Sequence, residues 1–173
     1  MSAARSEATR RRVLRLVATA AAAPLGARLL FTPSAKASAL PSVEIWKSPT
    51  CGCCARWVQY MRQAGFSLTV HETDDMAAIK DARGVPDDLR ACHTAIVNGY
   101  VIEGHVPAAD VLRLINERPP ARGMAVPGMP PASPGMDQAG PSYLVILFGT
   151  PAGNRIYAHH TRVAMEMETN HVT

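Results

Sequence analysis

Alternating apolar and polar positions along the first half of the chain predict four short β-strands. Residues 43–47 and residues 66–71 each alternate with a period of two, which is typical of half-buried strands. Two later β-rich runs, residues 94–97 and 100–103, flank Asn98-Gly99. Asn-Gly between such runs is the usual signal of a two-residue hairpin turn. We therefore expect two separate strands and then a β-hairpin.

Helical periodicity lies between and after these strands. Trp57, Met61 and Ala64 recur at helical spacing in residues 55–65, with Gly65 where a helix C-cap is expected. A short helix is predicted over residues 76–83, started by Asp74 or Asp75 and closed by Gly84. A third helix is predicted over residues 107–118 and stopped by the following prolines. The residues of this third helix expected to point inward are Val111, Leu112, Leu114 and Ile115.

The order strand, helix, strand, helix, strand, strand, helix predicts an α/β fold, with a mixed sheet flanked by helices. Residues 119–142 then change character, because seven of these 24 residues are proline, and we interpret them as a Pro/Met-rich loop. Residues 143–148 and 155–159 predict an added C-terminal β-hairpin. A Cys-x-x-Cys dithiol after the first strand of this arrangement resembles the thioredoxin-like fold.

Three of the four cysteines, Cys51, Cys53 and Cys54, fall on the turn from the first strand into the first helix. A helix N-terminus favours anions, so thiols there are readily deprotonated and become good nucleophiles and soft-metal ligands. Cys51 and Cys54 are three residues apart and face the same side of a helix start, so they form the natural pair. Cys92 precedes the third strand, whose start lies beside the first helix in a thioredoxin-like sheet.

The four cysteines allow three interpretations, which the spacing leaves open. They can form a soft-metal site completed by Met and His, a redox disulfide between Cys51 and Cys54 with Cys53 and Cys92 as a second pair, or two purely structural disulfides. A mononuclear zinc site is less natural, because the neighbouring Cys53 and Cys54 side chains diverge. Bridging thiolates in a multi-copper(I) cluster relax that demand, and methionine thioethers also favour Cu(I).

The formal charge of +4 belongs to the N-terminal segment. Residues 1–39 hold seven basic residues and one acid, whereas the rest holds 11 basic and 13 acidic residues, so no basic patch for nucleic acid is expected. Arg10-Arg11 before an alanine-rich stretch ending in Ala37-Ser38-Ala39 predicts a cleaved export signal of the twin-arginine type. Its apolar run is too short for a spanning helix. We expect a signal at residues 1–39, a metal-binding domain at 40–160 and a flexible tail at 161–173, in a bacterial periplasm.

Several separate blocks of sequence carry a resemblance to a known family. The blocks are residues 46–54 (WKSPTCGCC), 84–86 (GVP), 92–95 (CHTA), 98–107 (NGYVIEGHVP), 123–130 (GMAVPGMP) and 133–136 (SPGM). Together they resemble the CopG-type periplasmic metal-binding family linked to copper resistance, over most of the chain after the signal. The resemblance implies a thioredoxin-like fold, copper bound through cysteines and a redox role on copper itself.

Ligand positions follow from the same resemblance. It implies Cys51, Cys53, Cys54 and Cys92 as ligands, with Met129 or Met136 and His93 completing the site. His105 falls in a matching block, where a structural role suits a strand-end histidine equally well.

The interpretation we adopt is an exported copper-binding protein that holds Cu(I), more than one ion per chain, in a cysteine-thiolate site. It would act in copper resistance or handling, with copper ions and other periplasmic copper-handling proteins as its partners. The alternative is a thioredoxin-like thiol–disulfide oxidoreductase, in which Cys51 attacks and Cys54 resolves. Whether the protein is an enzyme stays open, because a copper-binding protein that also cycles copper between Cu(I) and Cu(II) would be a copper oxidoreductase, and the alternative would be a thiol–disulfide oxidoreductase.

Export can be tested directly on the chain's first residues. We expect the mature protein to begin near Leu40, because Ala37-Ser38-Ala39 is a small-x-small cleavage site. Replacing Arg10 and Arg11 by lysine should block export by removing the twin-arginine signal. N-terminal sequencing of protein from the periplasmic fraction measures both effects, and intact protein that retains Met1 there would contradict the prediction.

Overall fold

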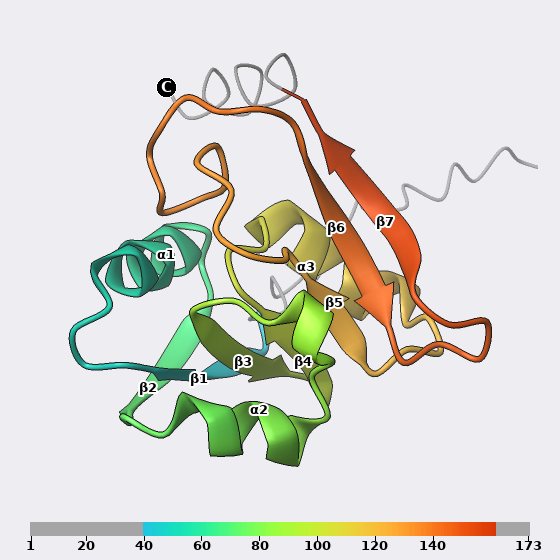
Figure 1. The fold of residues 1–173 in the computed structure, drawn as a ribbon, viewed down its shortest axis with the longest axis horizontal. Coiled ribbons are helices and arrows are strands. Elements are labelled where there is room, and N and C mark those ends of the chain that lie inside the picture. Colours follow the sequence, from blue (N-terminus) through green and yellow to red (C-terminus); the bar gives the residue numbers. More distant parts are fainter. Residues whose placement is uncertain (1–39, 162–173) are drawn as a thin grey trace, which may run out of the picture. The chain divides into compact units, whose positions relative to one another are not determined.

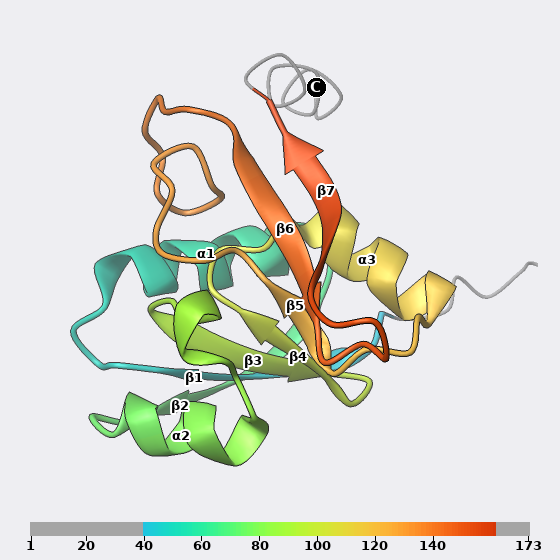
Figure 2. The same cartoon turned by 45° about the vertical axis from the view of Figure 1, so that its right-hand side comes forward.

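A mixed β-sheet of seven strands organises residues 40–161, the part of the chain that the computed structural model describes. Figures 1 and 2 show the sheet and its helices from two directions. The strands are β1 (Ser42–Lys47), β2 (Ser67–Glu72), β3 (His93–Val97), β4 (Tyr100–Glu103), β5 (Gly123–Ala125), β6 (Tyr143–Phe148) and β7 (Arg155–His160). The helices are α1 (Gly52–Gln63), α2 (Met76–Arg83) and α3 (Ala108–Glu117), with a 3₁₀ turn at Asp87–Leu89.

The order of strands across the sheet is β2-β1-β3-β4-β5-β6-β7. β1 runs parallel to β2, and β3 is antiparallel to both β1 and β4. The predicted α/β class, with a mixed sheet flanked by helices, is therefore confirmed. The name thioredoxin-like stays a prediction, which the order of the first four strands and the position of α1 after β1 support.

Local sequence signals place the element boundaries well. Asp75 is the N-cap of α2, and its side chain accepts a hydrogen bond from Ala78 N at 3.0 Å. Gly84 ends α2 in the left-handed conformation, with φ of 66°, where a residue without Cβ is favoured. Asn98 and Gly99 both have positive φ, as a type I′ hairpin turn requires. The predicted helix and hairpin boundaries hold to within a few residues.

The prediction of one uninterrupted loop over residues 119–142 is wrong in part. Residues 123–125 form β5, which pairs with β4 on one side and β6 on the other. The C-terminal hairpin is therefore continuous with the main sheet through β5. Met124 is fully buried in the core. A strand of three residues between proline-rich flanks gives too short a pattern for periodicity to detect.

The two faces of the sheet are covered differently. α1 and α3 lie on one face and α2 lies on the other (Figure 2). The larger core forms under α1 and α3, and includes Trp57, Met61, Val111 and Leu114. Because side chains alternate along a strand, Ile102 points to this core, whereas Val101 joins a smaller cluster.

Two predicted segments fall outside the described residues: the export signal at 1–39 and the tail at 161–173, of which only Thr161 is described. Between residues 40 and 161, the structure has no helix that is both long and apolar enough to cross a bilayer.

Close packing of β5 against β4 makes Gly123 a sensitive position. A Cβ added there would lie 2.0 Å from the Val101 carbonyl oxygen, so Gly123→Ala should force the two strands apart. We expect it to lower the free energy of unfolding by about 1–3 kcal/mol, as overpacking does. Chemical denaturation measures the change.

Gly52→Ala is the matched control, because Gly52 lies within α1 and its added Cβ would meet nothing closer than 3.8 Å. Alanine at this first helical position should leave the free energy of unfolding nearly unchanged or raise it slightly, because it causes no clash and favours helical backbone. Equal effects of the two substitutions would contradict the steric explanation.

Candidate metal centre

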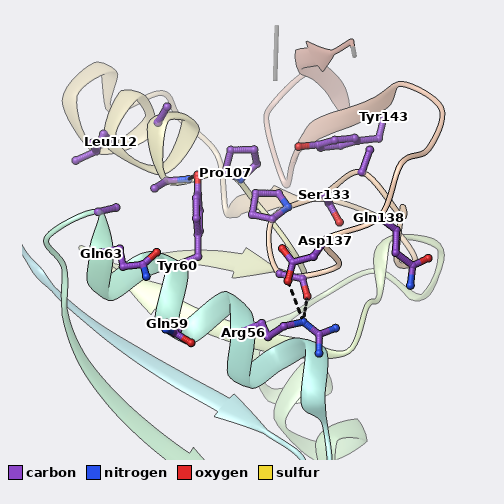
Figure 3. A pocket seen from close by; sticks show the side chains of 16 residues that line it. Arg56, Gln59, Tyr60, Gln63, Pro107, Leu112, Ser133, Asp137, Gln138 and Tyr143 are labelled. Atoms are coloured by element: carbon purple, nitrogen blue, oxygen red, sulfur yellow. Dashed lines mark hydrogen bonds and ion pairs between the residues drawn. The ribbon is translucent and has the colours of Figure 1, made fainter. Parts of the chain in front are cut away.

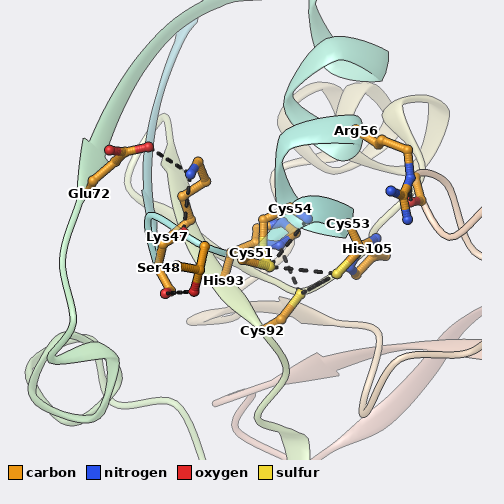
Figure 4. The surroundings of a disulfide bond; sticks show 12 residues. Lys47, Ser48, Cys51, Cys53, Cys54, Arg56, Glu72, Cys92, His93 and His105 are labelled. Carbon is orange, nitrogen blue, oxygen red and sulfur yellow. Dashed lines mark hydrogen bonds and ion pairs between the residues drawn. A yellow bond between two sulfur atoms is a disulfide. The ribbon is translucent and has the colours of Figure 1, made fainter.

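The start of α1 carries three sulfur atoms. Cys51 is the N-cap of the helix, and its Sγ accepts a hydrogen bond from Cys54 N at 3.3 Å. Cys51 and Cys54 form a disulfide, and Cys54 is fully buried. Cys53 takes no part in the disulfide, and it is half-buried with a free thiol beside Cys51 (Figure 4). The divergence of Cys53 from Cys54 follows from their adjacent positions in the first helical turn.

Cys92 joins these three sulfur atoms from the start of β3. Its Sγ lies 4.0 Å from Cys53 Sγ, and Cys53 Sγ lies 3.6 Å from Cys51 Sγ. All four sulfur atoms lie within 4.8 Å of one another. Cys53 and Cys92 are free thiols, so the possible second disulfide between them is not formed. The structure thus brings all four cysteines together, although Cys51 and Cys92 are 41 residues apart in sequence.

Two histidines flank Cys92 and form a second donor group with it. The Cys92 Sγ lies 3.3 Å from His93 Nδ1 and 3.0 Å from His105 Nε2. His105 is the residue whose part sequence reasoning undervalued. The sequence does carry a signal for its position. The two-residue hairpin turn pairs Thr94 with Glu103. Continuing that register by two residues places Cys92 opposite His105.

The hydrogen bond at the other ring nitrogen fixes the tautomer of His105. Its Nδ1 lies 2.7 Å from the Pro134 carbonyl oxygen, which can only accept, so Nδ1 carries the proton. The lone pair of Nε2 is then directed at Cys92 Sγ. Metal-binding histidines commonly have their second nitrogen held in this way. His105 is therefore prepared to act as a ligand.

His93 lies deeper, with no exposed surface. Its ring packs against Trp57, with 4.3 Å between the ring centroids. Among the described buried side-chain nitrogens and oxygens, His93 Nε2 has no hydrogen-bond partner. Burial lowers the pKa of His93 well below its ordinary value, and burial also lowers the pKa of His105. Both rings are thus neutral at neutral pH, the form in which imidazole binds metals.

The Cys92 thiol is held in its protonated form. Burial, followed by the nearby Cys53, raises the pKa of Cys92 to about 12. A proton or a metal cation must therefore neutralise this sulfur. Because a bound cation replaces the proton, metal binding at Cys92 releases a proton and strengthens as the pH rises.

The Pro/Met-rich loop packs over the start of α1. A Cβ on Gly135 would lie 2.7 Å from Trp57 N, and Gly135 has a φ of 84°, so glycine is required at this contact. Arg56 Nε donates to the Gly135 carbonyl at 2.7 Å and pairs with Asp137 at 3.2 Å. Met136 is half-buried beside this contact, whereas the Met129 side chain is 53% exposed. That Met129 or Met136 is a copper ligand stays a prediction.

A cavity of about 840 Å³ adjoins the site (Figure 3). It lies between α1, the start of α3 and the Pro/Met-rich loop, with Tyr60 and Tyr143 on its walls. Pro134 and Gly135 also line it. Since the Pro134 carbonyl holds His105, this short segment is a common wall of the cavity and the cysteine–histidine cluster.

The donor set fits a soft metal. Thiolates and imidazoles together suit copper and zinc, whereas oxygen ligands suit magnesium and calcium. The pairing of one Cys92 thiol with two neutral rings shows a site with more donor atoms than its internal hydrogen bonds use. The sulfur atoms of Cys53 and Cys92 lie 4.0 Å apart, so a single soft ion could contact both.

The family described as "Protein of unknown function, DUF411" matches residues 89–136. A comparison with curated proteins finds no match.

Two solved structures match a larger part of the chain, and both are of a copper resistance protein, copG. Its form 2 is 39% identical, with a TM-score of 0.65, and its form 1 is 38% identical, with a TM-score of 0.66. Each alignment covers 70% of this chain and 98% of the other. The chain therefore belongs to the CopG-type copper-resistance family.

Proposed function

We propose that this protein binds copper as Cu(I), more than one ion per chain, in a site built from four cysteine thiolates and two imidazoles. The ligands are Cys51, Cys53, Cys54, Cys92, His93 and His105, and Met129 or Met136 adds a thioether from the loop. The protein acts in copper resistance or handling. The observation that carries the proposal is the convergence of four sulfur atoms and two neutral imidazoles at one end of α1.

The number of ions follows from how the donors divide into two groups. Cys92 belongs both to the four-sulfur group and to the group with the two histidines. A sulfur shared in this way can bridge, and thiolates favour Cu(I). The start of α1 adds free N–H groups and the positive end of the helix dipole, which stabilise anionic thiolates there.

The disulfide must open before Cys51 and Cys54 can serve as thiolates. Its reduction takes two electrons, and two protons if thiols result. A thiol reductant of the same compartment can supply both and becomes a disulfide itself. Two Cu(I) ions that each lose one electron also balance the reduction to two thiolates. A redox role on copper would take that form.

Export to the periplasm is part of the proposal. Its support is the sequence of residues 1–39, which lie outside the described structure, and the copper-resistance family. Other periplasmic copper-handling proteins are the proposed partners that deliver or receive the ion.

A thiol–disulfide oxidoreductase is the second candidate, and the Cys51–Cys54 disulfide at the start of α1 favours it. That position lowers a thiol pKa and activates an attacking cysteine in such enzymes. The reductase needs only this pair, however, and leaves Cys53, Cys92 and both histidines without a chemical role.

Cysteine variants separate the two candidates. Cys53→Ser and Cys92→Ser should each remove at least one copper ion and weaken retention of the rest by about 10–100-fold or more, since a direct ligand is lost. Titration with Cu(I) under anaerobic conditions, against a competing chelator, measures number and affinity. Thr69→Ser, on the exposed side of β2, is the control and should bind copper as the unchanged protein does.

The outcome that reverses the conclusion is equally specific. Full copper binding by both cysteine variants, together with strong reduction of a model disulfide that survives Cys92→Ser, would establish the reductase instead. Saturation of the unchanged protein at one copper ion, with zinc competing equally, would contradict the multinuclear site.

The state of Cys92 before metal binding predicts its reactivity. With its pKa at about 12 rather than the ordinary 9.0, its thiolate fraction at pH 8 is about a thousandfold smaller. We expect alkylation of Cys92 by iodoacetamide to be slow in the folded, metal-free protein, and to accelerate about tenfold per pH unit. Mass spectrometry of the Cys92 peptide measures the rate. The same cysteine in unfolded protein is the control, and equal rates at pH 8 would contradict the prediction.

A further inference from the structure

A buried ion pair lies on the face of the sheet opposite the metal centre. Lys80 extends from α2 toward Glu103 at the end of β4, and the two side chains are 7% and 0% exposed. Lys80 Nζ lies 2.5 Å from Glu103 Oε1 and 3.1 Å from Thr94 Oγ1. The Thr94 hydroxyl donates to Glu103 Oε2 at 2.7 Å. None of these three residues belongs to the proposed copper ligands.

The Glu103 carboxylate also holds the backbone that precedes Cys92. Ala91 N donates to Glu103 Oε1 at 2.7 Å. Ala91 is adjacent to Cys92, and Glu103 is two residues before His105. One carboxylate thus cross-links the two chain segments whose side chains, Cys92 and His105, meet at 3.0 Å on the other face.

Two further contacts keep these segments in close register. Gly104 N donates to the His93 carbonyl at 3.0 Å. A Cβ on Gly104 would lie 2.6 Å from Ala91 Cβ, and Gly104 has a φ of 71°. The two segments therefore touch without an intervening side chain. The Ala91 N–H would otherwise need another acceptor, and the carboxylate is the acceptor that its position provides.

Stability alone is a weak reason for such a pair. Removing two charges from water is costly, and replacing a buried ion pair by apolar residues is often neutral or stabilising. A buried carboxylate that aligns two ligand-bearing segments has a second use, because supporting hydrogen bonds orient metal ligands.

From these contacts we propose that Glu103 is a positioning residue for the metal centre, and that Lys80 and Thr94 hold its carboxylate in place. Glu103 holds Ala91 so that Cys92 and His105 face each other at ligand distance before any ion arrives. The copper part of this inference rests on the proposed function, whereas the hold on Ala91 is a property of the metal-free protein.

Two uncharged double variants test the proposal as a matched pair. Lys80→Met with Glu103→Gln keeps a side-chain oxygen that can accept from Ala91 N, and its amide can donate to Thr94. Lys80→Met with Glu103→Leu has the same net charge and similar bulk, but offers Ala91 no acceptor. Any difference between the two therefore reports on the hydrogen bonds of the side chain at position 103 rather than on buried charge, and the Ala91 amide reports on its own bond.

The first readout needs no metal. We expect the Ala91 amide to exchange with solvent deuterium at least about tenfold faster in the leucine variant than in the glutamine variant, because its hydrogen bond is lost. Chemical denaturation of both proteins establishes that each is folded. Equal exchange at Ala91 would overturn the proposal whatever copper does.

The second readout is Cu(I) affinity against a chelator. The leucine variant should bind about 10–100-fold more weakly than the glutamine variant, the usual loss when a support behind a ligand is removed. Equal affinities in two folded variants, with copper still bound by the unchanged protein, would also overturn it. Failure of the unchanged protein to bind copper would overturn the proposed function instead and leave the Ala91 result to decide this inference.

Discussion

Burial of Trp57 is the constraint on which the site depends. This side chain has no exposed surface, and its indole nitrogen donates to the Val106 carbonyl at 2.9 Å. The ring packs on His93, while the backbone nitrogen meets Gly135. One residue of α1 thereby contacts three of the segments that surround the sulfur atoms. Because a large aromatic ring fills its space in only a few ways, α1 cannot shift without moving the histidine and the loop.

The two faces of the sheet carry different parts of the site. The face under α1 presents neutral rings and thiols, whereas the face under α2 holds the charged pair of Lys80 and Glu103. β3 passes between them, with His93 directed to the first face and Thr94 to the second. Alternation along a strand therefore lets adjacent residues serve binding and support. Within residues 40–161, the two donor groups that share Cys92 contain no carboxylate, a ligand type that suits harder ions.

The features of the fold that could be predicted depend on local signals, whereas the features that could not depend on neighbours in space. Asp75, Gly84 and Asn98-Gly99 act through their own backbone conformations, so caps and hairpin were predictable. β5 has three residues and exists because β4 and β6 flank it, which no local pattern shows. The approach of Cys92 to α1 was predictable from the order of elements. The hold of Pro134 on His105 was not, because it depends on how a proline-rich loop folds back.

The distribution of the proposed ligands along the chain has a thermodynamic consequence. Cys51, Cys53 and Cys54 lie within four residues and stay close even in an unfolded, reduced chain, whereas Cys92, His93 and His105 join them only through the sheet. An ion that also binds the unfolded chain stabilises the native state by less than its native affinity suggests. Copper should therefore stabilise this fold chiefly through the ligands of β3 and the segment after β4. The short cysteine motif can capture an ion early, while the folded sheet determines how firmly the ion is retained.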